Sequence, residues 1–385
     1  MDVSFSLIST FSQPTLTRLL PALLQAESVV FDGAASQLLC RGTSGQLEQV
    51  EVQLAAELKS LQIDWESHSA TPETNDSGDI PLYELSALVL TILSSDSNML
   101  PHELLAGLVE WDVELRAMRR LSPAGAQDEL ALELYLDSAD NGARLRKVLP
   151  ALSQHHGVDL VLAASDSKRP RRRMLAFDMD STLIRCEVID ELAARAGVGE
   201  AVAAVTARAM RGELDFCSSF RERLASLEGL PSATLASVAE SLPLMPGVVS
   251  LLRTLKAQGH YTVILSGGFD YFAKCLQQQL GFDEVHANTL QLNNDVLTGD
   301  VIGVIVDGER KVALLQEIAA AQGIEMRDTV AVGDGANDLP MLAAAGLGVA
   351  FHPKPLVREK AGCSVEHADL TSLLYVLGVP RSTAG

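Results

Sequence analysis

Two aspartates, separated by one residue, follow a short apolar run at 174–177. They are Asp178 and Asp180, and Ser181 and Thr182 come directly after them. The run predicts a buried parallel strand, and open α/β sheets bind ligands beyond the carboxyl ends of such strands. Alternate residues of a strand point to opposite faces, so both aspartates can serve one site only if the backbone turns there. A helix N-cap with a spare acid is the alternative interpretation.

A hydroxyl and two glycines end a second apolar run, at 263–265. Glycine lets the backbone approach a ligand closely, and amides at a helix start can hold an anion together with a hydroxyl. Ser266, Gly267 and Gly268 are therefore candidates for a phosphate-binding loop, although a simple turn has the same composition.

A third apolar run, at 329–332, leads into a glycine-bracketed acidic loop that contains Asp334 and Asp338. Carboxylates from two strand ends form the oxygen-rich site that Mg²⁺ prefers when it also keeps water and a phosphate oxygen. The predicted metal ligands are Asp178, Asp180 and Asp334. Asp338 is expected to contact these ligands rather than the metal itself. A turn with solvated acids is the alternative.

Lys311 lies at the start of a predicted helix over residues 311–318. Cations favour the C-terminus of a helix over its N-terminus, so a lysine here should have an anionic partner. Near several carboxylates and a phosphate it would neutralise charge and steady the transferred group. On an unrelated helix it would be a solvated side chain.

In this order, the four motifs resemble those of the haloacid dehalogenase-like phosphohydrolases, and the residues between them narrow the likeness to the phosphoserine phosphatase family. The resemblance covers roughly residue 171 to the C-terminus. It implies Mg²⁺-dependent hydrolysis in which Asp178 attacks phosphorus to form an aspartyl-phosphate. Asp180 would protonate the leaving alkoxide and then activate water, and Lys311 would be the third catalytic residue.

The same resemblance implies that the substrate is O-phospho-L-serine and that the reaction is the last step of serine biosynthesis. Glu187 would bind the substrate ammonium and Arg223 its carboxylate, whereas an exposed ion pair is their ordinary interpretation. Asn337 would orient the phosphate or Asp334. The other substrate-binding residues that it implies are Met210, Phe216, Ser266 and Gly267.

Elementary chemistry favours a carboxylate nucleophile for such a reaction. Phosphate monoesters hydrolyse extremely slowly in water, and a covalent intermediate divides the reaction into two easier steps. Asp178 must be ionised to attack, while Asp180 must carry a proton when the serine oxygen leaves, so the two acids need different environments.

Two alternative functions stay open. One is a phosphatase or phosphotransferase that acts on another small phosphomonoester. The other is a catalytically silent regulatory protein that binds an amino acid, although the complete set of motif residues argues against it.

The length of 385 residues exceeds the usual size of a single domain, so we expect several. A haloacid dehalogenase-like, Rossmannoid parallel α/β sheet is expected over 171–385. The interval 184–244 is rich in alanine, leucine and charged residues and is too long for a simple crossover between strands. We interpret it as an inserted helical cap that closes over the site and excludes water.

Two βαββαβ patterns are predicted upstream, at 1–75 and 81–165, separated by a polar linker. Both resemble ACT domains, the small amino-acid-sensing modules of some phosphoserine phosphatases. The glycine expected after the first strand is absent at 12–15 and 98–101, so no effector is assigned. Such units leave sheet edges and half-covered faces that another copy, from the same chain or from a partner, can complete, and we expect a homodimer through these domains.

Composition excludes several classes of function. The formal net charge of −20 disfavours nucleic acid and anionic membranes as partners, and the basic run at 168–173 is interpreted as a solvated linker. No apolar stretch reaches the roughly 18 residues of a membrane span. The start lacks a signal sequence, so we expect a cytoplasmic enzyme. Five scattered cysteines indicate reduced thiols rather than a disulfide or zinc framework.

Overall fold

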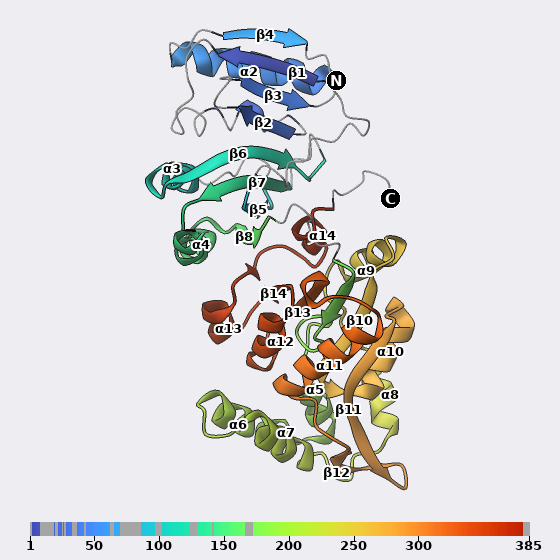
Figure 1. Ribbon diagram of the computed structural model, residues 1–385. Helices are drawn as coiled ribbons and strands as arrows, with labels where there is room; N and C mark the ends of the chain where they lie inside the picture. The colour runs from blue at the N-terminus through green and yellow to red at the C-terminus, as the bar shows by residue number, and fades with distance from the viewer. Residues whose placement is uncertain are drawn as a thin grey trace. The chain divides into compact units, whose positions relative to one another are not determined.

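The computed structural model divides the chain into two compact units (Figure 1). The first unit comprises residues 1–170, 366–368 and 372–385, and the second comprises 171–365 and 369–371. The residues that the structure describes are 2–7, 19, 22–24, 26, 28–32, 37–41, 44–61, 65–69, 86–96, 102–123, 129–140, 142–165 and 172–379.

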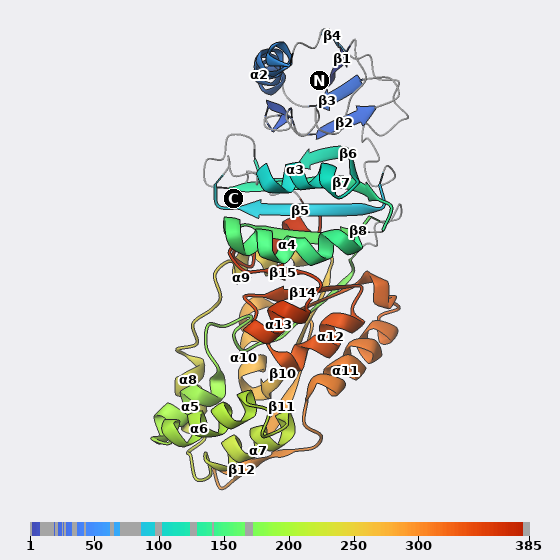
Figure 2. The same ribbon diagram turned by 90° about the vertical axis from the view of Figure 1, so that its left-hand side faces the viewer.

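The first unit contains one eight-stranded sheet with the strand order β4-β1-β3-β2-β6-β7-β5-β8. Helices α3 and α4 lie on one face of this sheet (Figure 2). Its elements are β1 (Asp2–Leu7), β2 (Ser28–Asp32), β3 (Gln37–Arg41), α2 (Ser44–Ser60), β4 (Trp65–Ser69), β5 (Leu88–Ser94), α3 (His102–Glu110), β6 (Val113–Arg120), β7 (Leu130–Ser138), α4 (Ala143–His156), β8 (Asp159–Ala164) and α14 (Ser372–Val376).

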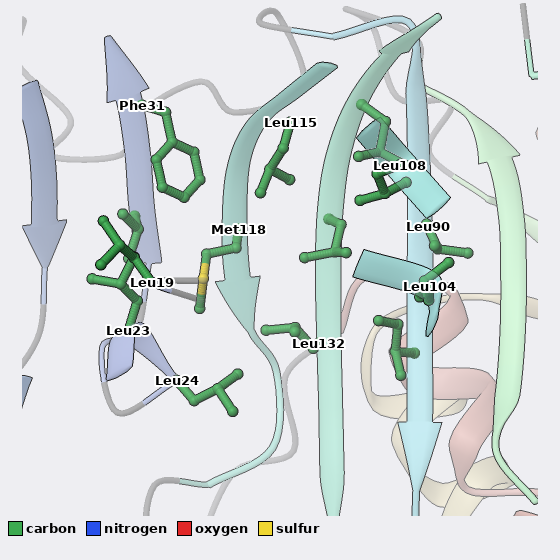
Figure 3. Close-up of a cluster of buried hydrophobic side chains, with 14 of the residues drawn as sticks. Leu19, Leu23, Leu24, Phe31, Leu90, Leu104, Leu108, Leu115, Met118 and Leu132 are labelled. Atoms are coloured by element: carbon green, nitrogen blue, oxygen red, sulfur yellow. The ribbon is translucent and has the colours of Figure 1, made fainter. Parts of the chain in front are cut away.

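The two predicted N-terminal domains share this sheet, because β2 pairs with β6 in antiparallel register, with Val29 opposite Met118. Their apolar side chains form one core. Figure 3 shows Leu19, Leu23 and Phe31 beside Met118. Burial of such side chains stabilises a fold by about 1.5–3 kcal/mol each. One sheet edge of each of these two domains is therefore completed by the other domain of the same chain, which is one of the two possibilities that we expected.

A buried carboxylate attaches a late segment to the first unit. Asp159, at the start of β8, has no exposed surface, and its carboxylate accepts hydrogen bonds from the amides of Glu366, His367 and Ala368. The Glu366 bond measures 2.6 Å and the Ala368 bond 2.9 Å. A buried charge is tolerated only when it is well paired, and these amides provide the pairing.

The second unit contains a seven-stranded sheet with the order β12-β11-β10-β9-β13-β14-β15. The strands from β11 to β15 in that order run parallel, and β12 is antiparallel to β11, which confirms the predicted α/β class. The strands are β9 (Met174–Phe177), β10 (Tyr261–Phe269), β11 (Glu284–Asn293), β12 (Val296–Ile302), β13 (Thr329–Gly333), β14 (Leu347–Phe351) and β15 (Ser364–Val365).

Helices of the second unit cover the sheet or belong to the interval 184–244, which lies between β9 and β10. That interval begins and ends in an antiparallel bridge between Ile184 and Leu244, and α6 and α7 lie together in it (Figure 1). Its helices are α5 (Val188–Ala196), α6 (Gly199–Met210), α7 (Phe216–Ala225) and α8 (Ala233–Ala239). The others are α9 (Val248–Ala257), α10 (Asp270–Leu280), α11 (Gly308–Ala321), α12 (Leu339–Ala344) and α13 (Pro355–Lys360).

Some predictions lie outside the described residues: the polar linker, the two positions of the expected glycines and most of the basic run at 168–173. Among the residues that are described, no helix is long and apolar enough to cross a membrane.

Candidate active site

The register of three parallel strands brings the motif residues to one edge of the sheet. Phe177 of β9 lies opposite Ile264 of β10 on one side and Val332 of β13 on the other. Asp178 and Asp334 therefore leave adjacent strands close to each other, and both are buried. The sheet edge is where the sequence predicted that ligands bind.

The backbone turns after Asp178, as the spacing of the two aspartates requires. Ser181 adopts a left-handed conformation with φ 58° and donates its amide to the Cys186 carbonyl at 3.2 Å. Such a conformation is strained for a residue other than glycine and is often found at functional sites. The turn brings the Asp180 carboxylate against Gly268, where a Cβ atom would collide with it.

Lys311 lies in the first turn of α11, is fully buried, and has the anionic partners that its position predicted. Its Nζ donates to Asp178 Oδ1 and to Asp338 Oδ1, each at 2.6 Å. Burial lowers the pKa of the Lys311 ammonium, but the two carboxylates outweigh it and hold that pKa above its ordinary value. The lysine therefore stays charged and fixes the orientation of Asp178.

Three carboxylates could hold a metal ion, because oxygens of Asp178, Asp334 and Asp338 lie within 4.8 Å of one another. Asp338 is already engaged: Lys311 binds one of its oxygens, and the Gly335 amide binds the other at 2.9 Å. Asp178 and Asp334 are therefore the better candidate ligands.

Asp180, which the sequence placed among the metal ligands, is not in this carboxylate group. Its Oδ1 instead accepts a hydrogen bond from the Val188 amide at 2.9 Å, at the start of α5. The turn at Ser181 directs the Asp180 side chain toward Gly268.

The acids of the site have perturbed pKa values because they are buried together. Burial raises the pKa of Asp178 to about 8, with Asp338 adding to the shift and Lys311 opposing it. Burial, together with Glu187 and Asp178, raises the pKa of Asp180 well above its ordinary value. Burial also raises the pKa of Asp334 to about 6, against the lowering effect of Lys354. The raised pKa of Asp180 favours its protonated form, which a general acid requires, whereas the ion pair with Lys311 favours the ionised form of Asp178.

The predicted phosphate loop lies where β10 loses its regular pairing with β11, between Leu265 and Phe269. Ser266 is buried, and its hydroxyl accepts the Gly268 amide at 2.9 Å. Asn288, which sequence reasoning missed, holds the Gly267 carbonyl through its Nδ2 at 2.8 Å. Asn288 lies in a strand of mixed polar and apolar residues, so the sequence carried no signal that singled it out.

Two of the predicted substrate contacts, Phe216 and Asn337, border this loop. A Cβ at Gly267 would come 2.8 Å from Phe216 Cζ and 3.6 Å from Asn337 Nδ2, so both side chains border the glycine. Met210, predicted to cover the site with Phe216, is 81% exposed at the end of α6. The Met210 side chain is thus largely open to solvent in this conformation.

Glu187 is the N-cap residue of α5, Arg223 lies on α7, and both act electrostatically on Asp190. The Asp190 carboxyl has its pKa raised by burial and by Glu187 and lowered by Arg223, so both charges act on it. Ser181 Oγ donates to Glu187 Oε1 at 3.1 Å. The turn at Ser181 therefore helps to position Glu187, the residue predicted to bind the substrate ammonium.

Lys354 is the second residue that sequence reasoning missed. Its Nζ lies 3.0 Å from Glu187 Oε1 and 3.2 Å from Asp334 Oδ2. It follows β14, so a fourth strand end was the signal that could have drawn attention to it.

A family model of haloacid dehalogenase-like hydrolases matches residues 175–343. The chain is 48% identical over 237 residues to a phosphoserine phosphatase of Streptomyces coelicolor, covering 62% of this chain and 58% of that protein. It is 49% identical over 210 residues to the phosphoserine phosphatase SerB2 of Mycobacterium tuberculosis, covering 54% and 51%. The chain thus spans little more than half the length of these two relatives. A Saccharomyces cerevisiae phosphoserine phosphatase is 35% identical over 306 residues, covering 76% and 97%.

Solved structures show the same likeness. A HAD family hydrolase from Salmonella enterica has a TM-score of 0.68 at 32% identity, covering 76% of this chain and 98% of that one. A substrate-bound phosphoserine phosphatase complex has a TM-score of 0.51 at 39% identity, covering 53% and 97%. A phosphoserine phosphatase with an analogue of the phospho-aspartyl intermediate has a TM-score of 0.51 at 40% identity, covering 53% and 98%.

Proposed function

Because the chain belongs to the phosphoserine phosphatase family of haloacid dehalogenase-like hydrolases, we propose that it hydrolyses O-phospho-L-serine to L-serine and phosphate. The observation that carries the proposal is the fully buried Lys311, held at 2.6 Å from both Asp178 and Asp338. A buried ion pair is a weak source of stability, so such a cluster beside a glycine-rich loop is better explained by catalysis. The reaction would complete serine biosynthesis.

We propose Mg²⁺ as the cofactor, with Asp178 and Asp334 as the residues that would hold it. The donor set fits, because it consists of carboxylate oxygens only. When bound, Mg²⁺ would neutralise charge on the phosphoryl oxygens in the transition state. Asp338 would hold Lys311 rather than the metal.

The first half-reaction begins with Asp178, whose Oδ1 is fixed by Lys311. An oxygen of Asp178 attacks phosphorus, a bond from that oxygen to phosphorus forms, and the bond from phosphorus to the serine oxygen breaks. Asp180 gives its proton to the departing serine oxygen, which leaves as the neutral hydroxyl. In the second half, Asp180 takes a proton from water, the water oxygen bonds to phosphorus, and the Asp178 carboxylate is released with phosphate.

The charged ends of the substrate would be recognised by residues of α5 and α7 and of the loops around them. We propose that Glu187 receives the ammonium, that Arg223 binds the carboxylate, and that Met210 becomes buried when the cap closes. The proposed phosphate contacts are Ser266, Gly267 and Asn337, and Phe216 would close the site above Gly267.

A phosphate-release assay over phosphoamino acids and sugar phosphates tests this proposal. Phosphoserine should show the highest kcat/KM, and activity should vanish with a chelator and return when Mg²⁺ is added. Faster turnover of another phosphomonoester would replace the proposed substrate. Absence of any Mg²⁺-dependent turnover would favour the alternative function, a catalytically silent regulatory protein that binds an amino acid.

For the first unit we propose two ACT-like domains, 1–75 and 81–165, that assemble the protein as a homodimer, with 171–385 as the catalytic domain. The support is the sheet itself, whose outermost strands are β4 and β8. Light scattering should give a dimer for the full chain and a monomer for a chain that begins near Ser165. A full chain that stays monomeric at micromolar concentration would contradict the proposal.

A further inference from the structure

Lys354 is fixed to the active site through its backbone. Its amide donates to the Asp334 carbonyl at 3.1 Å, in the loop between β14 and α13. His352, two residues earlier, has φ 43°, a left-handed conformation that is costly for a histidine. The loop thus accepts backbone strain while it holds Lys354 over the metal-binding motif.

The Lys354 side chain joins two carboxylates that are proposed to bind different cations. Its Nζ contacts Glu187 Oε1 at 3.0 Å, where the substrate ammonium would bind, and Asp334 Oδ2 at 3.2 Å, where the metal would bind. The lysine side chain is 53% exposed, whereas that of Asp334 is 3% exposed. The ammonium therefore reaches the site from solvent, on a flexible stem.

We propose that Lys354 is a displaceable cation, which neutralises Glu187 and Asp334 while the site is empty and releases them when metal and substrate ammonium bind. The inference rests on the proposed function, because that function assigns the two incoming cations. It makes Lys354 a residue that sets metal affinity and selectivity for a charged amine, and it is not a catalytic residue.

The physical basis is a surplus of negative charge. Glu187 and Asp334 both approach Lys354. Asp178 and Asp338 lie close to Asp334, and both of them share the single positive charge of Lys311. An empty site without Lys354 would leave Glu187 and Asp334 to repel each other. A half-exposed lysine pair is weak enough to be broken by a divalent ion or by a substrate that is held at its other charged groups.

A lysine that instead stays in place to orient the two carboxylates would have the opposite signature. Its removal would weaken metal binding and reduce the preference for an ammonium-bearing substrate, because both ligands would lose a fixed partner. The two roles therefore differ in the sign of the change.

The test compares Lys354→Met with Lys360→Met, which removes one charge from the exposed end of α13, the short helix that follows Lys354. Calorimetric Mg²⁺ titration of the full chain without substrate should show binding about fivefold tighter in Lys354→Met, as expected for loss of one partly screened charge pair. Its melting temperature without metal should fall below that of the wild type, and saturating Mg²⁺ should close the gap. The Lys360→Met protein should match the wild type in both measurements.

The second measurement is the ratio of kcat/KM for phosphoserine to that for its deaminated analogue, which keeps the phosphate and carboxylate. This ratio should rise in Lys354→Met, because the unpaired Glu187 favours an ammonium and repels a substrate without one. Lys354→Arg keeps the charge and should return both readouts toward the wild type.

Weaker or unchanged Mg²⁺ binding in Lys354→Met would overturn the proposal, and so would a lower selectivity ratio. Failure of the proposed function has a separate signature, since the wild-type protein would then not hydrolyse phosphoserine. The metal titration and the metal-free melting temperature would still report on Lys354 in that case.

Discussion

Two buried aspartates, one in each unit, show how similar side chains can serve different ends. Asp159 in the first unit is paired with backbone amides of residues 366–368, which are neutral and fixed. Asp178 in the second unit is paired with a lysine and crowded by Asp334 and Asp338. Backbone amides satisfy a charge permanently, whereas a cluster of mutually repelling acids leaves a group whose charge and contacts can change during a reaction. The following predictions test this comparison.

Asp178→Asn should have the largest effect on activity. The amide keeps the size of the side chain but cannot attack phosphorus, so turnover should fall by at least about 10⁴-fold while the protein stays folded. Phosphate release measures the loss of turnover. Acid-quenched labelling should trap no phosphoprotein, because the variant cannot form the aspartyl-phosphate. Substantial residual turnover would remove Asp178 from the nucleophile's role.

Asp180→Asn should lower turnover by about 10²- to 10⁴-fold, the usual range for a general acid and base. A phosphorylated protein should still form and should hydrolyse slowly, because the nucleophile is intact. Rapid-quench labelling measures this directly. Equal loss of labelling in the Asp178 and Asp180 variants would contradict the division of roles between the two acids.

Arg223→Ala should reduce kcat/KM for phosphoserine by roughly 10- to 150-fold, the equivalent of a charged hydrogen bond of about 1.5–3 kcal/mol. A phosphoester without a carboxylate should lose much less. Steady-state kinetics on both substrates gives the comparison. A similar loss for both would make Arg223 a structural residue of α7.

Asp159→Ala should act on stability instead, lowering the free energy of unfolding by about 1–3 kcal/mol because several buried amides lose their acceptor. Turnover per folded molecule should not change. Urea unfolding of the variant and of a Glu110→Ala control, an exposed acid of the same unit, provides the measurement. A large catalytic defect in the folded Asp159 variant would break the comparison.

Asp283→Asn should have the smallest effect, below about 1 kcal/mol, because its partner Lys256 is partly exposed. Burial raises the pKa of Asp283, but hydrogen bonds from Lys256 and Thr262 outweigh it and hold that pKa below its ordinary value. The stabilisation is thus complete above the unfolded-state pKa of about 3.9 and is lost as the pH falls through the folded value. Unfolding measured from pH 7 to pH 3 should show the wild type and variant converging in acid.

The motif strands and their order could be predicted because each combines an apolar run with chemically specific residues just after it. Asp178, Ser266 and Asp334 were identified in this way, and the parallel register brings their strand ends together. The turn after Phe177 was predictable from spacing alone. The direction of the Asp180 side chain was not, because it depends on the conformation of Ser181 and on the space beside Gly268.

Lys354 and Asn288 carry no motif of their own, so neither was found. Lys354 reaches Asp334 only because β14 pairs with β13 and the loop after β14 folds back so that the Lys354 amide contacts the Asp334 carbonyl. Asn288 matters through its contact with the Gly267 carbonyl, on a neighbouring strand. Both contacts join residues that are far apart in the sequence.

By itself the sequence indicated the family and the strands, and it predicted the nucleophile and the acid beside it, because these depend on local patterns of residue type and spacing. Only the tertiary structure decided that β2 pairs with β6 to unite the N-terminal halves in one sheet. It also decided that Lys311 stands between Asp178 and Asp338 and that Lys354 stands between Glu187 and Asp334. Such pairings depend on strand register, loop conformation and burial, which are set by the packing of distant segments.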